Sequence, residues 1–266
     1  MNEFLENNRS LWNGWTQLHK GSRFYDVESF KAGRSSLKPL ELEEIGDVAG
    51  KSLLHLQCHF GMDTLSWARL GARVVGADFS DEAITFARAL ASELDLPARF
   101  VRSNVYDLPA ALEDSFDIVF TSYGVLSWLP ELDPWAAVVS HFLKPGGFFY
   151  IAEFHPFVFM LGDDGRTFEY PYFHTPVPIE LVSTGSYAAP EAKDFSHTEY
   201  NWSYSLADVV NALLRAGLHL EFLHEFPYWH SNLLTSEEFE PGKSRLAGWP
   251  VEIPHMFSLR ARRENE

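Results

Sequence analysis

Two residues between Ser52 and Ser80 have the chemistry to bind a nucleotide, and both stand beside short apolar runs. Gly61 precedes a helical pattern, and the free N–H groups at a helix N-terminus attract anions. Asp78 ends an apolar run, where its carboxylate could accept two hydrogen bonds from a ribose diol. The order of strand, tight turn, helix, strand and acid predicts the mononucleotide-binding half of a doubly wound α/β fold, with the ligand at the carboxyl ends of the strands.

Local patterns define the elements that would hold these two residues. The runs 53–56 and 73–77 are apolar and too short for helices, which indicates buried strands. The helix between them has one apolar face and is stopped by Gly71; that face consists of Met62, Leu65, Ala68 and Leu70. In the turn, Gln57 and His59 stand where a dinucleotide-binding enzyme carries glycine. The missing glycines disfavour a nicotinamide-dependent oxidoreductase, which stays the rival enzyme.

The remaining patterns continue the alternation of helix and strand. We expect helices over 2–19 and 41–48, after Ser80, after Asp133 and after Ser205, and strands over 100–101, 116–121, 148–153, 218–225 and 256–261. Asp133 followed by Pro134 predicts a helix cap, and Lys144 to Gly147 predicts a turn. The stretch 154–204 breaks the alternation and indicates an insertion of short strands and loops, while 226–253 is an aromatic-rich loop.

Composition narrows the class of partner. The formal net charge is −16, whereas a nucleic-acid or anionic-membrane surface calls for basic residues. Aromatic residues make up 15% of the chain, which suits a large core or an enclosed organic-ligand pocket. Cys58 is the single cysteine, so no intrachain disulfide can form. With no signal peptide and no long apolar run, we expect a cytoplasmic protein without nucleic-acid or membrane partners.

Five stretches, in order, together resemble the class I S-adenosylmethionine-dependent methyltransferases. They are LHLQCHFG at 54–61, GADFS at 76–80, RSNV at 102–105, FDIV at 116–119 and LKPGG at 143–147. The first is similar to that of a bacterial branch of unassigned substrate, which carries LQCHFG in place of the glycine-rich run. The resemblance implies a Rossmann-like, mostly parallel seven-stranded sheet with helices on both faces, whose last strand runs antiparallel.

The resemblance also implies S-adenosylmethionine as cofactor and a set of residues around it. Asn104 stands where the family usually has an acid that meets the adenine amine, and its carbonyl oxygen could accept the same bond. The side chain of His59 must point away from the cofactor, or the loop must bind it differently. The expected cofactor-binding residues are Gln57, Cys58, His59, Gly61, Asp78, Phe79, Ser80, Asn104, Val105, Tyr123 and Tyr25.

Methyl transfer is an in-line displacement, so an enzyme must align nucleophile and methyl and exclude water. A general base helps when the nucleophile is a hydroxyl or a protonated amine. By position after the fourth and fifth strands, we expect Tyr123, Glu153 and His155 to be catalytic. The alternatives are packing for Tyr123, a paired core-edge carboxylate for Glu153 and a loop hydrogen bond for His155. We expect no metal site.

We expect one methyltransferase domain over 1–266: a helical lid (1–50), a cofactor-binding core (51–153), an insertion (154–204), and a final helix with two strands (205–266). The pocket roof should come from 12–25 and from the insertion after Phe157. The acceptor is expected to be a small organic molecule, and the sequence leaves open a monomer or a homodimer. A protein that binds S-adenosylmethionine without catalysis is the rival from another class.

Overall fold

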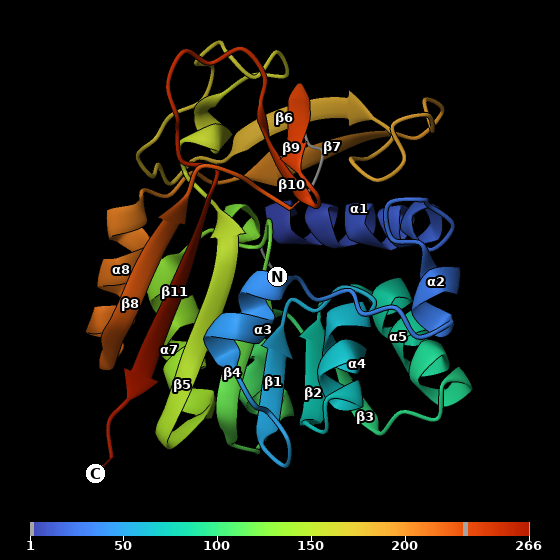
Figure 1. Ribbon diagram of the computed structural model, residues 1–266, viewed down its shortest axis with the longest axis vertical. Helices are drawn as coiled ribbons and strands as arrows, with labels where there is room; N and C mark the ends of the chain where they lie inside the picture. The colour runs from blue at the N-terminus through green and yellow to red at the C-terminus, as the bar shows by residue number, and fades with distance from the viewer. Residues whose placement is uncertain (1–2, 231–233, 266) are drawn as a thin grey trace.

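The computed structural model describes residues 3–230 and 234–265, and a seven-stranded sheet forms its centre (Figure 1). The strand order is β3-β2-β1-β4-β5-β11-β8. Neighbours from β3 to β5 pair in parallel, whereas β11 runs antiparallel to both β5 and β8. This arrangement confirms the predicted fold class, including the antiparallel last strand. The strands are β1 (Ser52–Leu56), β2 (Arg73–Asp78), β3 (Ala98–Arg102), β4 (Phe116–Ser122), β5 (Leu143–Phe154), β8 (Leu218–Phe226) and β11 (Met256–Arg263).

Helices cover both faces of the sheet, which explains why its central strands are continuous apolar runs. On one face, α7 (Leu132–Phe142) and α8 (Leu206–Arg215) place Trp135 and Leu213 in the larger core. On the other, α3 (Pro39–Ile45) and α4 (Met62–Arg69) place Ile45 and Trp67 against the strands. Next to α4, α5 (Asp81–Glu93) packs on Phe100 of β3.

Three local predictions are corrected. Asp133 lies inside α7, whose N-cap is Glu131, because its carboxylate pairs with Arg215 of α8 instead of capping. The predicted turn 144–147 is the start of β5, where the pairing with β4 shifts register. The loops also contain elements that the sequence analysis did not resolve: α2 (Val27–Lys31), α6 (Leu108–Ala111), and the hairpin of β9 (Ser236–Glu240) with β10 (Lys243–Leu246).

The first helix, α1 (Glu3–His19), lies across the carboxyl ends of the parallel strands, between the sheet and the hairpin of β6 (Ile179–Thr184) and β7 (Ser196–Asn201) (Figure 1). Asn8 of α1 binds the backbone of Tyr200 twice, donating to its carbonyl at 2.7 Å and accepting from its N–H at 3.0 Å. Trp15 donates to the carbonyl of Gly185 at 2.9 Å. The α1 helix thereby joins the insertion to the cofactor-binding core. In the described part of the chain, no helix combines the length and apolarity needed to cross a membrane.

Candidate functional site

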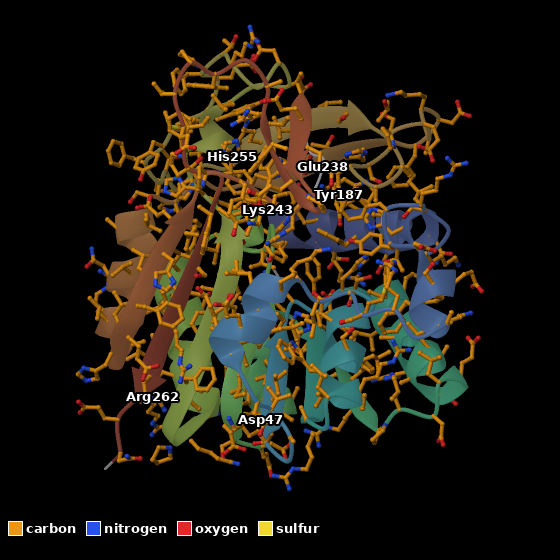
Figure 2. All side chains as sticks on the ribbon, in the orientation of Figure 1. Asp47, Tyr187, Glu238, Lys243, His255 and Arg262 are labelled. Carbon is orange, nitrogen blue, oxygen red and sulfur yellow. The ribbon has the colours of Figure 1, made fainter. Side chains whose placement is uncertain are left out.

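A cavity of about 760 Å³ opens above the carboxyl ends of the parallel strands. Its floor comes from the ends of β1 to β4 and the loops that follow them, and its roof from α1, the insertion and residue Trp229. This confirms the expected origin of the roof in 12–25 and in the insertion. In Figure 2, Tyr187, a roof residue, lies in the upper half of the view, whereas Asp47 lies near the bottom. The volume lies within the range of about 300–1,000 Å³ that is typical of ligand pockets.

The loop between β1 and α4 has an unusual backbone. Gln57 and His59 adopt positive φ angles of 54° and 49°, as does Gly61 at 80°. Such conformations cost energy for residues other than glycine, so the surroundings must hold them in place. A Cβ on Gly61 would approach the ring of Phe100 to 2.5 Å. Glycine is therefore required here by packing against Phe100, where the sequence had suggested close approach to a ligand.

Asp78 holds this loop. One carboxylate oxygen accepts from the N–H of His59 at 2.8 Å and the other accepts from the N–H of Ser80 at 2.8 Å. Burial raises the pKa of Asp78 to about 6. Each carboxylate oxygen can accept a further bond, so the side chain retains the capacity to bind a diol from the cavity that it lines.

Most of the predicted cofactor-binding residues line this one cavity, including Asn104 at the end of β3. Its carbonyl oxygen accepts from the N–H of Tyr106 at 3.2 Å and has one lone pair left for an adenine amine. Ser80 does not line the cavity, because its hydroxyl caps α5 and donates to Asn13 of α1 at 2.7 Å. Those that do are Tyr25, Gln57, Cys58, His59, Gly61, Asp78, Phe79, Asn104, Val105 and Tyr123. The thiol of Cys58 is buried, which raises its pKa well above the usual value and leaves it unreactive.

The two side chains that replace glycine each present an unpartnered polar atom. Gln57 donates from Nε2 to the carbonyl of Val125 at 3.0 Å, which fixes the amide orientation and leaves Oε1 buried without a partner in the described chain. His59 has Nε2 3.1 Å from Nδ1 of His19, and its own Nδ1 is likewise buried and unpartnered. Both residues line the cavity, so Oε1 of Gln57 and Nδ1 of His59 are available to hydrogen-bond a ligand.

His19 links this loop to the insertion, with Nε2 3.0 Å from the hydroxyl of Ser186. Burial lowers the pKa of His19 to about 3 and that of His59 well below its ordinary value, so both imidazoles are neutral. The Ser186 oxygen accepts from the N–H of Ala189 at 3.0 Å and is free to donate to His19. When Ser186 donates to Nε2 of His19, the proton of His19 is on Nδ1 and is donated to Nε2 of His59. The proton of the neutral His59 ring is then on its own Nδ1.

Glu153 binds the backbone of the loop after β4. Its carboxylate accepts the backbone N–H groups of Gly124, of Val125 at 2.7 Å, of Leu126 at 3.2 Å and of Phe154 at 2.7 Å. The side chain is buried and does not line the cavity. Three of these four N–H groups belong to the loop that carries Tyr123, so the geometry favours a positioning role, and the catalytic role expected for Glu153 stays a prediction.

Tyr123 does reach the cavity, and it does so with a φ of 42°. Its ring packs on Phe154 with a centroid distance of 5.9 Å. Burial, followed by the nearby carboxyl of Glu41, raises the pKa of the phenol well above its ordinary value. Tyr123 is therefore an uncharged group at the cavity wall and cannot serve as a ready base.

His155 is not brought to the cavity. Its Nδ1 accepts from the N–H of Phe157 at 3.0 Å, and its Nε2 lies 2.9 Å from the carboxylate of Glu225 on β8. Its backbone N–H donates to the carbonyl of His255 at 2.9 Å. Both ring nitrogens thus face protein groups, and the catalytic role expected for His155 stays a prediction that this geometry does not favour.

Sequence reasoning missed two residues that line the cavity: Glu199 of β7, in the roof, and Trp128, in the loop after β4. The alternation of polar and apolar residues at 196–201 marks a strand with two distinct faces, but not which face meets a pocket. The ring of Trp128 packs edge to face on Trp12 and on Trp15 of α1, a contact between segments more than a hundred residues apart.

The chain resembles known methyltransferases in sequence and in fold. Residues 54–151 match a family described as "Methyltransferase domain". A ubiquinone biosynthesis O-methyltransferase of Photorhabdus laumondii is 31% identical over 130 residues, which are 47% of this chain and 54% of that protein. An S-adenosylmethionine dependent methyltransferase of Mesorhizobium loti has a similar solved structure, with a TM-score of 0.57 at 20% identity, covering 88% of this chain and 100% of that one.

Residues 54–151 match a methyltransferase domain, and the sheet has the fold of a solved S-adenosylmethionine-dependent methyltransferase. Both findings agree with the cofactor that the sequence predicted, S-adenosylmethionine. The chain spans about half the length of the curated relatives that it matches first, for example 54% of the Photorhabdus enzyme.

Proposed function

We propose that the protein transfers the methyl group of S-adenosylmethionine to a small organic molecule, and that its first motif places it in the branch with LQCHFG. One observation supports this most: acceptor groups at the ends of three neighbouring strands face a single enclosed cavity. Asn104 follows β3, Asp78 ends β2 and the loop 57–61 follows β1. When bound, the cofactor supplies an electrophilic methyl group on a sulfonium.

The residues of the chain would hold the cofactor in the order of the strands. Asn104 takes the adenine amine and Asp78 the ribose diol, so the amino-acid arm extends over β1. There Gln57 and His59 present their unpartnered atoms. Oε1 of Gln57 accepts from the ammonium, and Nδ1 of His59 donates to the carboxylate of that arm. Two side chains would thus replace the backbone contacts of a glycine-rich loop.

The main contributions of the protein to methyl transfer would be to exclude water and to align the acceptor with the methyl group. The roof built by α1 and the insertion encloses the space above the β1–α4 loop, and Tyr123 lies at its wall. Of the three residues expected to be catalytic, Tyr123 alone lines the cavity. We infer that it positions the acceptor, while Glu153 and His155 support the surrounding loops.

The direct test is a pair of binding titrations on the purified protein. We expect S-adenosylmethionine or S-adenosylhomocysteine to bind in the micromolar range by calorimetry and NAD to show no binding. Turnover is then screened with labelled methyl donor and small phenols, amines and carboxylates. Binding of NAD with no binding of S-adenosylmethionine contradicts the proposal. Binding of the cofactor without methylation of any acceptor favours the rival function, a cofactor-binding protein that lacks catalysis.

Glycine substitution at 57 or 59 tests the side chains without straining the backbone, since glycine tolerates positive φ. Hydrogen bonds to charged groups contribute about 1.5–3 kcal/mol, so His59→Gly should weaken S-adenosylhomocysteine binding by about 10- to 100-fold. The Kd of 5′-methylthioadenosine, which lacks the amino-acid arm, should change less than about threefold. Calorimetry with both ligands gives the comparison, and Gln57→Gly should behave alike. An equal loss for the two ligands would mean that these side chains only shape the loop.

The other expectations stay predictions. The division into lid, core, insertion and final segment, the absence of a nucleic-acid partner and the cytoplasmic location rest on the sequence. Size-exclusion chromatography with light scattering distinguishes a monomer from a homodimer. The acceptor named for the Photorhabdus relative concerns that protein, and we propose for this chain the broader class of small organic acceptors.

A further inference from the structure

Among the residues that the structure describes, the roof of the cavity contains one carboxylate, in largely apolar surroundings. Along β7, His197, Glu199 and Asn201 lie on one face of the strand, and all three line the cavity. The residue opposite Glu199 on β6 is Leu181, which also lines it. The side chain of Glu199 is 17% exposed. An acid therefore lines the cavity from the β6–β7 hairpin, whereas Asp78, Asn104 and the loop 57–61 come from the ends of β1 to β3.

Glu199 has no cationic partner among the residues that the structure describes. Its one hydrogen bond comes from the amide of Asn201 at 3.2 Å. The nearest basic atom is Nε2 of His197 at 4.0 Å, and burial lowers the pKa of that imidazole. Burial raises the pKa of Glu199 itself. Burying a carboxylate without a partner is costly, so a cation supplied by a ligand would stabilise it.

Three indole rings form a corner beside this acid. Trp12 and Trp15 meet at 79°, Trp12 and Trp128 at 77°, and Trp15 and Trp128 at 89°, with centroids 5.2–5.8 Å apart. All three line the cavity. The ring of His197 packs on Trp15 at 5.2 Å, and that of His59 on Trp12 at 5.1 Å. The corner therefore spans from the cofactor loop to the strand that carries Glu199, and indole faces attract cations.

The charges around the cavity also favour a cationic ligand. Its charged lining residues in the described chain are three acids, Asp63, Asp78 and Glu199, and two bases, Arg34 and Lys38. Arg34 is 3.6 Å from the carboxylate of Asp26 and donates to backbone carbonyls, so its charge is partly compensated. The whole chain carries a formal charge of −16, which favours the approach of cationic ligands.

We propose that the methyl acceptor is a small amine whose ammonium group binds between Glu199 and the corner of Trp12, Trp15 and Trp128. This rests on the proposed methyltransferase function and adds the substrate class. An ammonium nitrogen has no lone pair and is no nucleophile, so Glu199 is an anchor that sets the orientation of the acceptor and takes no proton from it.

Matched ligand pairs test the proposal. Tyramine, tryptamine and histamine are titrated by calorimetry into protein saturated with S-adenosylhomocysteine, each beside the analogue in which a methyl group replaces the ammonium: 4-propylphenol, 3-propylindole and 4-propylimidazole. We expect at least one amine to bind tenfold or more tightly than its analogue. Glu199→Gln should reduce that ratio to about one. The control Glu180→Gln, an exposed acid on β6 that does not line the cavity, should leave it unchanged.

A second pair of variants keeps the test independent of the folding of the first. Trp128→Leu should reduce the amine preference by about threefold or more, while Trp128→Phe, which keeps an aromatic face, should retain most of it. The proposal is overturned if no amine binds more tightly than its neutral analogue, or if Glu199→Gln folds and retains the preference. Failure of S-adenosylhomocysteine to bind the unaltered protein would instead contradict the methyltransferase function.

Discussion

Replacing Asp78 with alanine should weaken the binding of S-adenosylmethionine by about 10²–10⁴-fold. The carboxylate would lose two ribose hydrogen bonds, each worth about 1.5–3 kcal/mol because the acceptor is charged, and about 1.4 kcal/mol corresponds to a tenfold change in Kd. It would also release the N–H groups of His59 and Ser80, which it holds at 2.8 Å. Isothermal titration calorimetry with S-adenosylhomocysteine measures the effect.

The control is Asp81→Ala, an acid three residues further on that pairs with Arg9 and Arg102 and does not line the cavity. This variant should bind the cofactor within about twofold of the unaltered protein. If Asp78→Ala folds and binds with unchanged affinity, the ribose site lies elsewhere.

The same carboxylate predicts a pH dependence of binding. Burial raises the pKa of Asp78 to about 6, and the ionised form is the better acceptor for a diol. As the pH falls through 6, protonation should compete with the cofactor, and its Kd should rise by up to about tenfold per pH unit. Asp78→Asn cannot titrate, so its weaker binding should be flat over that range. An equal slope in both proteins would assign the titration to another group.

The grouping of the residues proposed to bind the cofactor could be predicted, because it depends on short segments. Asp78 and the loop 57–61 lie next to strands whose apolar runs are visible in the sequence, and parallel strands bring their carboxyl ends to one edge. Position along the chain was therefore enough to gather Asp78, Asn104 and Gly61. The reason for Gly61 was not visible, since the ring of Phe100 that excludes a Cβ comes from β3.

The acceptor side could not be predicted in the same way. Trp12, Trp128 and Glu199 come from three segments far apart in the sequence, and they line one cavity only because α1 crosses the sheet edge and the β6–β7 hairpin folds over it. Alternation in β7 predicts two faces, but only the tertiary arrangement decides which one meets a cavity. Gln57 and His59 are the exception, because they were visible in the sequence as departures from the glycine-rich pattern. Each of them presents an unpartnered polar atom at the cavity.

His155 shows why order along a strand is insufficient. Residues 153 and 155 share one side of an extended chain, which predicts the same surroundings for both side chains. In the structure each meets a different partner, because Glu153 faces the loop after β4 and His155 faces Glu225 of β8. Since β11 and β8 complete the sheet beyond β5, the partners of His155 come from 70 residues downstream, at Glu225, and 100 residues downstream, at His255.

Glu153→Gln should lower the free energy of unfolding by about 2–5 kcal/mol. The carboxylate accepts four backbone N–H groups, two on each oxygen, and the amide would keep one oxygen and turn a donor toward the other two N–H groups. Part of the loss is offset because the variant no longer buries a charge. Since whole domains are stable by only about 5–15 kcal/mol, urea unfolding would resolve the change.

A catalytic role and a positioning role for Glu153 predict opposite results. If the carboxylate only positions, the loop that holds Tyr123 at a φ of 42° should loosen, so stability and S-adenosylhomocysteine affinity should fall together. If it acts on the acceptor, turnover should fall while stability and cofactor affinity stay unchanged. Glu131→Gln, an exposed acid at the far end of the same loop, is the control and should alter neither. Because Glu153 is 1% exposed and absent from the cavity wall, we expect the first pattern.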